Sequence, residues 1–262
     1  MRLTVVGCAG SFAGPDSPAS CYLVQAQHKG RTWNLVLDLG NGALGPLQAL
    51  IDLHDIDALV LSHLHPDHCM DVTGLFVVQK YHPSRAPEDT RRLPVYGPQD
   101  TAARLVRANA VTLSESKDPH GMDPEFDFRV LTHKEPFTVG PFRVTPFRVN
   151  HPVEAYGVRV EADDTVLVYT GDTDDTPVLD ELLTGADLAL TDSAYQEERD
   201  AISGIHLSGR RAATAAVRAG DVKRLMLTHI PVWNDPAECV AEATEVWPGD
   251  VELARAGQTY EI

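Results

Sequence analysis

The fold of this chain is decided by one short stretch, Ser62-His63-Leu64-His65-Pro66-Asp67-His68, which directly follows the apolar residues 58–61. Four potential metal ligands, His63, His65, Asp67 and His68, fall within six positions of this stretch. A packed core has no use for that concentration of imidazole and carboxylate groups, because buried polar groups need partners. An apolar strand that ends in such a cluster holds the ligands at its carboxyl end. The stretch therefore predicts a metal site.

The spacing within the cluster suits two metal ions. His63 and His65 are two positions apart, so in extended backbone their side chains leave the strand on the same side. Asp67 and His68 come from the turn that follows, at the expected amino terminus of a helix, and can face a neighbouring position. Two ions about 3.5–4 Å apart clamp both the attacking and the leaving oxygen of a displacement, and a carboxylate is suited to bridge them. Mixed imidazole and carboxylate ligands favour zinc first, with manganese or iron as the other candidates.

Further candidate ligands lie close behind other predicted strands. His151, Asp172 and His229 each follow an apolar run, and His206 lies in a loop. Ligands at the ends of strands are held by a rigid sheet, which a preorganised site requires. Taken alone, His151 or His229 could be an ordinary loop or core histidine, and Asp172 could be a turn or helix-capping residue. For His206, a cap or a local hydrogen bond is the alternative to a role in the site.

The hydrophobic pattern predicts strands and helices in two rough halves. Helical spacing predicts helices at residues 43–53, 67–79, 99–110, 178–183, 209–219 and 236–246. Between residues 126 and 149 the apolar residues alternate, which predicts antiparallel strands with one buried face. No Pro/Gly/Ser-rich or charged linker divides the halves. We therefore expect one domain over residues 1–262, built from two sheets with helices outside.

Composition limits the partners. The formal net charge of −16 argues against electrostatic capture of long nucleic acid, which needs many Lys and Arg contacts to phosphates. A small anionic substrate stays possible, because bound cations dominate the local field. The four cysteines form no C-x-x-C pair and are expected to be buried thiols, which favours a cytoplasmic setting. Cys69 adjoins His68, but nearby ligands already suffice without it. No stretch is long and apolar enough to span a membrane.

The ordered set of motifs resembles the metallo-β-lactamase superfamily. The set comprises H-x-H-x-D-H after a strand, a later isolated His, Gly171-Asp172-Thr173 after a strand and Leu227-Thr228-His229 near the carboxyl end. The resemblance covers essentially the whole chain and implies an α/β fold, the αββα sandwich, with helices on the outer faces of two mixed sheets. It also implies the roles of seven ligands. His63, His65 and His151 would bind the first metal, Asp67, His68 and His229 the second, and Asp172 would bridge them.

A finer resemblance concerns Gly204-Ile205-His206-Leu207-Ser208, the alanine-rich helix after it and Leu227-Thr228-His229-Ile230-Pro231. These segments resemble the phosphodiesterase branch that includes ribonuclease Z. By that resemblance His206 would contact the scissile phosphate and would not bind metal. Ribonuclease Z usually carries a long arm for tRNA between its third histidine and its bridging Asp. Here His151 and Asp172 are only 21 positions apart, which leaves no room for the arm.

Three other segments are similar to actinobacterial proteins regarded as atypical class II cyclic-nucleotide phosphodiesterases. They are Gly7-Cys8-Ala9-Gly10-Ser11, Gly14-Pro15-Asp16-Ser17-Pro18-Ala19-Ser20 and Tyr81-His82-Pro83-Ser84-Arg85. This resemblance implies hydrolysis of 3′,5′-cyclic nucleotides, with cAMP favoured, to 5′-mononucleotides by a hydroxide bridging two metals. Asp67 would orient the hydroxide, and His206 would stabilise charge or assist the leaving 3′-oxygen. His82 and Arg85 could line the pocket, reach it from a dimer partner or form a solvated loop. The loop 7–20 could approach an anion or form a plain turn.

Three other functions stay open at this point. They are RNA 3′-processing of the ribonuclease Z type, hydrolysis of an ester, thioester or lactone on the same metals, and a non-catalytic metal-binding or regulatory role. The branch resembled is commonly dimeric. The apolar segment 75–78 could contribute to a homodimer interface, although core packing explains it equally well.

Overall fold

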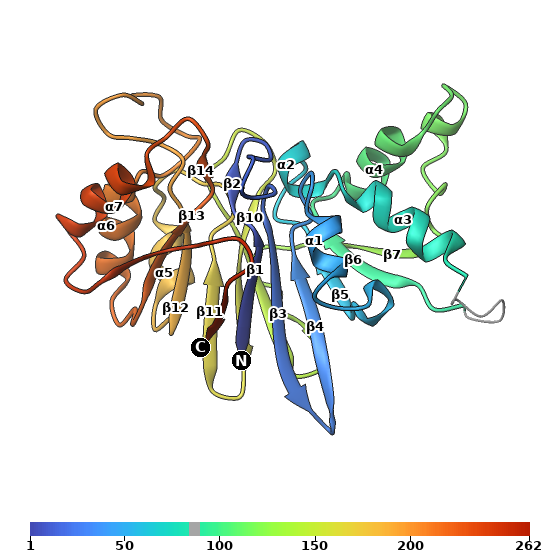
Figure 1. The fold of residues 1–262 in the computed structure, drawn as a ribbon, viewed down its shortest axis with the longest axis horizontal. Coiled ribbons are helices and arrows are strands. Elements are labelled where there is room, and N and C mark those ends of the chain that lie inside the picture. The colour runs from blue at the N-terminus through green and yellow to red at the C-terminus, as the bar shows by residue number, and fades with distance from the viewer. Residues whose placement is uncertain (84–89) are drawn as a thin grey trace.

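Two seven-stranded sheets lie face to face in the computed structural model, which describes residues 1–83 and 90–262 (Figure 1). The first sheet has the order β16 (Thr259–Glu261), β1 (Arg2–Gly7), β3 (Cys21–His28), β4 (Arg31–Leu37), β5 (Ala58–Val60), β6 (Leu93–Gly97) and β7 (Phe126–Val130). The second has the order β15 (Val251–Leu253), β13 (Leu225–Thr228), β12 (Leu188–Asp192), β11 (Thr165–Tyr169), β10 (Tyr156–Ala162), β9 (Phe142–Arg148) and β8 (Phe137–Val139). The short strands β2 (Ala9–Gly10) and β14 (Ile230–Pro231) pair with each other.

Helices cover the outer face of each sheet. The first sheet carries α1 (Leu44–Gln48), α2 (Pro66–Cys69), α3 (Val72–Tyr81) and α4 (Thr101–Asn109), with 3-10 turns η1 (Leu53–Asp55) and η2 (Glu115–Lys117). The second sheet carries α5 (Val178–Leu183), α6 (Gly209–Ala219) and α7 (Pro236–Thr244). The two groups lie on opposite flanks of Figure 1. The predicted αββα sandwich, with two mixed sheets and helices outside, is therefore confirmed.

The inner faces of the sheets form one shared apolar core. Tyr22 on β3 meets Tyr169 on β11, with ring centroids 4.9 Å apart, and both side chains are buried. The strands β5 and β12 are buried along their whole length, since each has the other sheet on one side and helices on the other. Such doubly covered strands read as continuous apolar runs in the sequence. Residues 58–60 therefore hold the metal-binding stretch on rigid backbone.

The direction of one strand corrects the sequence prediction. Residues 142–148 do run antiparallel to β10, as predicted, but β7 belongs to the other sheet and runs parallel to β6. The helix α4 separates β6 from β7 and returns the chain to the same edge, which gives a parallel pair. Alternation of apolar residues shows that one face of a strand is buried, but it carries no information on the direction of the neighbouring strand.

Two predicted helices are shorter than expected. The helix predicted at residues 43–53 ends at Gln48, and the one predicted at 67–79 is divided into α2 and α3. The division has a local cause, because the segment after β4 packs against the break. The backbone N–H of Leu39 donates to the carbonyl of His68, and that of Asp71 donates to the carbonyl of Leu39. These hydrogen bonds replace helical ones and fix α2 as a separate turn.

The segment proposed for dimer contact is largely core. Leu75 is fully buried and Phe76 nearly so, within the apolar cluster between α3 and the first sheet. Val77 points outward, at 50% exposure. Core packing thus accounts for Leu75 and Phe76, and the homodimer stays a prediction. Within the described parts of the chain, no helix combines the length and apolar character that crossing a bilayer requires.

Candidate metal centre

The predicted ligands gather at one edge of the sandwich, where several strands end. His63 and His65 follow β5, and α2 begins immediately after them with Pro66 in its first turn. The strands β9, β11 and β13 run in one direction, so the residues after them, His151, Asp172 and His229, reach the same edge. This is the upper edge in Figure 1, near α2 and β14. Ligand sites of mixed sheets commonly lie beyond the carboxyl ends of strands.

The first group of ligand atoms comes from His63, His65, His151 and Asp172, and these atoms all lie within 4.8 Å of one another. His65 Nδ1 is 2.9 Å from His63 Nε2 and 3.2 Å from His151 Nε2. Asp172 Oδ2 is 3.6 Å from His63 Nε2. Three imidazole nitrogens and one carboxylate oxygen that converge in this way match the donor set of a tetrahedral metal site.

The second group comes from Asp67, His68, Asp172 and His229, again with ligand atoms within 4.8 Å. Asp172 joins the two groups, because Oδ1 is 3.2 Å from His68 Nε2 and Oδ2 is 3.2 Å from His229 Nε2. Asp67 Oδ2 lies 3.5 Å from His68 Nε2. The structure thus brings all seven predicted ligands together, with Asp172 between the groups. Their roles as ligands stay a prediction.

Buried atoms without partners supply a test of whether a metal fits. His68 Nε2, His229 Nε2 and Asp172 Oδ1 are buried and make no hydrogen bond in the described structure, although each Nε2 lies 3.2 Å from an oxygen of Asp172. Buried polar atoms are nearly always satisfied, since an unpaired one costs about 1–3 kcal/mol. All three atoms point into the same space. Divalent cations bound there would satisfy them, so the residues present fit two metals.

The outer nitrogens of four histidines are already occupied. His68 Nδ1 donates to Asp38 Oδ2 at 2.8 Å, and His151 Nδ1 donates to the carbonyl of Ile205 at 2.9 Å. The Nδ1 atoms of His63 and His229 pair with the hydroxyls of Ser62 and Ser20 respectively, at 3.1 and 3.0 Å. These hydrogen bonds hold the four rings with each Nε2 facing inward. Metal-ligating histidines are typically oriented in this way.

Asp38 is a site residue that the sequence analysis did not identify. Its buried carboxylate accepts from the backbone N–H and hydroxyl of Ser62, from His68 and from the hydroxyl of Tyr169. It therefore ties the start of the metal-binding stretch to both sheets. Gly40, two residues after Asp38, lets this segment lie close to α2, because a Cβ at Gly40 would lie 2.0 Å from the carbonyl oxygen of Asp67. The only sequence signal was an Asp at a strand end before a small-residue turn.

Electrostatics in the cluster keep the carboxylates ionised. Burial works to raise the pKa of Asp67, but the hydrogen bond and charge of His68 lower it to about 2. Burial also opposes ionisation of Asp172, yet His229 and His68 hold its pKa well below the usual value. Burial lowers the pKa of His63 and His151, which favours neutral imidazoles. Burial also works to lower the pKa of His68, but the carboxylates of Asp172 and Asp38 raise it well above the usual value, so His68 would lose its proton on binding a metal. Ionised carboxylates and neutral imidazoles are the forms that bind metal.

His206 lies beside the centre and has a different environment. Its Nδ1 donates to Asp192 Oδ2 at 2.9 Å, and Asp192 is fully buried at the end of β12. Burial lowers the pKa of His206, but the charge of Asp192 raises it to about 9, so the imidazolium persists at neutral pH. The ring centroids of His206 and His229 are 5.5 Å apart. Asp192 was not identified in the sequence analysis, since nothing in the residues 188–192 marks its side chain as pointing to the site.

The loop 7–20 helps to hold His229. The strand β2 pairs with β14, which follows His229 directly, and the hydroxyl of Ser20 contacts the ring of His229. Gly10 permits the contact, because a Cβ would lie 2.2 Å from the carbonyl oxygen of His229. His229 itself has a φ of +59°, an uncommon conformation that this packing maintains. The loop is therefore more than a plain turn.

Other candidates lie elsewhere. Cys69 is buried and outside all three groups of potential ligand atoms in the described structure, the third being Asp172, Asp192 and His206. Burial raises the pKa of the Cys69 thiol to about 12. His82 follows α3 and contacts the ring of His54, away from the metal centre, which argues against His82 lining the site of its own chain. Arg85 lies outside the described residues. The histidines that the sequence analysis left unassigned are also absent from the described ligand groups, namely His28, His54, His120 and His133.

Comparisons with known proteins agree with this geometry. Residues 33–230 match the family described as Beta-lactamase superfamily domain. The chain is 41% identical to an uncharacterized protein of Mycobacterium leprae, over 100% of this chain and 89% of the relative. It is 28% identical to Ribonuclease Z of Mycobacterium bovis, over 87% of this chain and 85% of that one. The crystal structure of the metallo-beta-lactamase fold protein YhfI from Bacillus subtilis superposes with a TM-score of 0.83 at 26% identity, covering 99% of both chains. The chain therefore belongs to the metallo-β-lactamase superfamily, related to ribonuclease Z and YhfI, and is a metal-dependent hydrolase.

Proposed function

We propose that the chain is a phosphodiesterase that hydrolyses 3′,5′-cyclic nucleotides, with cAMP favoured, to 5′-mononucleotides. The observation that carries the proposal is the Asp192–His206 pair beside the metal centre, with 2.9 Å between Nδ1 and Oδ2. A buried imidazolium next to two metals offers a positive charge and a proton where a phosphodiester gains negative charge and loses an alkoxide. Hydrolysis of a carboxylic ester on the same metals does not require that group.

Two divalent ions, with zinc favoured by the imidazole-rich donors, would supply Lewis acidity and lower the pKa of a bound water. His63, His65 and His151 would hold one ion, Asp67, His68 and His229 the other, and Asp172 both. The remaining chemistry belongs to the chain. The carboxylate of Asp67, which its pKa of about 2 keeps ionised, orients the attacking water and takes up the water's proton as the new P–O bond forms.

The proton for the leaving group comes from His206. Its Nδ1 is fixed by Asp192, so Nε2–H is the atom that can donate to the substrate. As water forms the new P–O bond, the bond between phosphorus and O3′ breaks, and His206 protonates O3′. The pKa of about 9 keeps His206 protonated before the reaction and leaves it acidic enough to protonate an alkoxide.

The short connection between His151 and Asp172 supports a small substrate over tRNA. This connection is filled by the hairpin of β10 and β11, whose strands pair from Val158 with Tyr169 to Ala162 with Thr165. A long RNA-binding arm has no place there. The net charge of −16 also disfavours a folded RNA, which presents many phosphates. Because one relative is named Ribonuclease Z, RNA 3′-processing is the second candidate.

A substrate panel tests the proposal. Protein of measured metal content is assayed with 3′,5′-cAMP, 2′,3′-cyclic nucleotides, bis(p-nitrophenyl) phosphate, a thioester and a precursor tRNA. We expect turnover of 3′,5′-cAMP to 5′-AMP and of the simple diester. Cleavage of the simple diester without the cyclic nucleotides would preserve the chemistry and reject the substrate. Preferred cleavage of the tRNA or the thioester at matched concentration would replace the proposal by the corresponding alternative.

A further inference from the structure

Two exposed aromatic side chains stand on the two segments that flank His229. Phe12 is 44% exposed and Trp233 is 58% exposed, and their ring centroids are 5.4 Å apart. Packing within the chain therefore covers only part of each ring, and apolar surface that stays exposed can mark a binding site. We call Phe12 and Trp233 the aromatic pair. Two exposed rings on the segments beside His229 suit a ligand with an aromatic face.

The backbone places the aromatic pair at the edge that carries the metal centre. Phe12 comes two residues after β2, and Trp233 two residues after β14, and these strands pair with each other. The register joins Ile230 to Ala9, directly after His229. Trp233 is four positions after His229, so their Cα atoms are at most about 14 Å apart. The strands β2 and β14 lie along the upper edge of Figure 1, the edge at which α2 also lies.

Both aromatic residues are presented on restrained turns. The N–H of Phe12 donates to the carbonyl of Gly10 at 2.8 Å, and the N–H of Asn234 donates to the carbonyl of Pro231 at 2.9 Å. The Asn234 side chain then anchors the turn, since its amide donates to the carbonyl of Ala194 at 2.8 Å and accepts from Arg199 at 2.7 Å. A rigid turn lowers the entropy lost when a ligand binds.

We propose that the aromatic pair stacks on the nucleobase of the substrate while the metal centre holds its phosphate. This inference rests on the proposed function and names the base-recognition element of that site. If the metal centre holds the phosphate, the base extends from it toward the edge where the aromatic pair lies. Stacking is then possible, because every base has a π face and an aromatic side chain offers another.

The test uses two substrates that differ only in the base. The first is 3′,5′-cAMP, and the second is the same 3′,5′-cyclic ribose phosphate without a base. We expect Trp233→Ala and Phe12→Ala each to lower kcat/KM for cAMP about tenfold, the order of effect of a lost stacking partner. For the base-free substrate, kcat/KM of each variant should stay within twofold of the value for the unmodified protein, a difference of about 0.4 kcal/mol. Trp233→Phe, which keeps an aromatic face, should restore most of the loss.

Tyr81→Ala is the matched control, because Tyr81 is also an exposed aromatic residue (66%) but lies at the end of α3. It should change neither substrate. Equal losses for both substrates, or no loss for cAMP, would overturn the stacking role. A change in sedimentation coefficient with unchanged kinetics would assign the aromatic pair to a contact between protein copies instead. If the unmodified protein cleaves bis(p-nitrophenyl) phosphate but neither cyclic substrate, the proposed function fails and the inference falls with it.

Discussion

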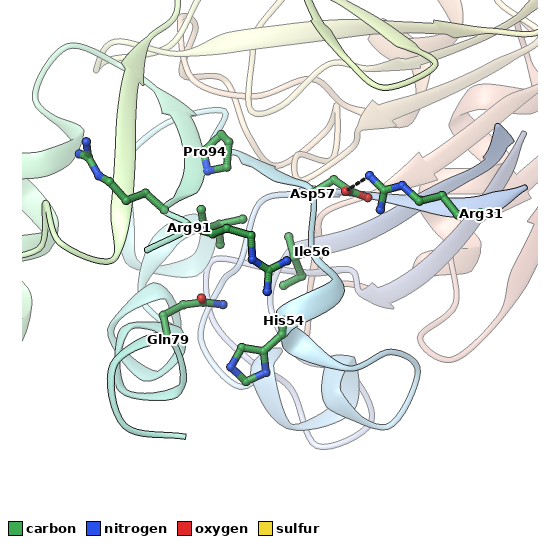
Figure 2. A pocket seen from close by; sticks show the side chains of 9 residues that line it. Arg31, His54, Ile56, Asp57, Gln79, Arg91 and Pro94 are labelled. Carbon is green, nitrogen blue, oxygen red and sulfur yellow. Dashed lines mark hydrogen bonds and ion pairs between the residues drawn. The ribbon is translucent and has the colours of Figure 1, made fainter. Parts of the chain in front are cut away.

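Two polar regions lie at opposite ends of the same strands of the first sheet, and only one of them gathers candidate metal ligands among the described residues. The metal centre follows the carboxyl end of β5. The other region is a cavity of about 450 Å³ at the amino ends of β4, β5 and β6, which we call the arginine cavity. Figure 2 shows Arg31, His54, Gln79 and Arg91 around it. It is lined by Arg31, His54, Ile56, Asp57, Gln79, Arg91, Arg92, Leu93 and Pro94.

The difference lies in how the polar atoms are satisfied. In the arginine cavity Arg31 pairs with Asp57 at 2.7 Å, and the Arg92 guanidinium donates to the carbonyl of Phe126. His54 Nε2 is buried without a hydrogen bond, but no ligand group in the described residues includes His54. At the metal centre, unpaired atoms from three residues converge on one space. Convergence of unsatisfied buried atoms, rather than the size of a cavity, distinguishes a reactive site from a surface depression.

The largest expected effect comes from removing the atom that joins the two ligand groups. Asp172→Ala should lower hydrolysis of bis(p-nitrophenyl) phosphate by at least about 10³-fold, because Lewis-acid stabilisation of charge is worth several kcal/mol. Metal analysis should show that at least one ion is lost. The matched control is Asp57→Asn in the arginine cavity, which should change the rate less than about twofold. Full metal content and rate in Asp172→Ala would remove the distinction between the two regions.

The next effect concerns the proton donor. His206→Ala should retain both metals and lower kcat for cAMP by about 10²-fold, the lower end of the range for a general acid. Asp192→Asn should lower it in the same direction, because the neutral amide no longer stabilises the imidazolium. Kinetics and metal content are measured on the same preparations. A His206→Ala protein with both metals and full turnover would refute this role.

A smaller effect is expected at Asp38, which does not face the metals. Asp38→Asn keeps the size of the side chain but removes the charge that orients His68 through Nδ1. Metal affinity should fall by about 10–100-fold, as is typical when the partner of a metal-ligating histidine is lost. Competition with a chromophoric chelator measures it. A lower free energy of unfolding, monitored by circular dichroism, with unchanged metal affinity would assign Asp38 to structure alone.

The smallest effect is predicted in the arginine cavity. Arg31→Ala breaks the ion pair with Asp57, but the Arg31 side chain is 52% exposed. An exposed pair contributes about 0–1 kcal/mol, so the free energy of unfolding should fall by less than about 1 kcal/mol. Urea unfolding and diester hydrolysis are the measurements. A fall in activity of more than twofold would mean that a change in the arginine cavity affects hydrolysis at the metal centre.

The prediction of the fold was accurate for features that follow from the local pattern of apolar residues. It was less accurate for features that depend on contacts with distant segments. The two sheets and the outer helices follow from the apolar runs, and residues 209–219 form a helix as predicted. The direction of β7 and the break between α2 and α3 depend on contacts with distant segments. The hydrogen bonds of Leu39 with His68 and Asp71 are an example, because they join residues far apart in the sequence.

The sequence by itself determined the candidate ligands of the metal centre. His63, His65, Asp67 and His68 are dense enough in one stretch, and His151, Asp172 and His229 regular enough behind strands, for the set to be recognised. Only the tertiary structure decided which residues support them. Asp38, Ser20 and Asp192 reach the centre through the folding of separate strands onto one edge. The physical reason is that a metal ligand must be a particular residue type, whereas its supporting partner need only be a hydrogen-bonding group in the right place.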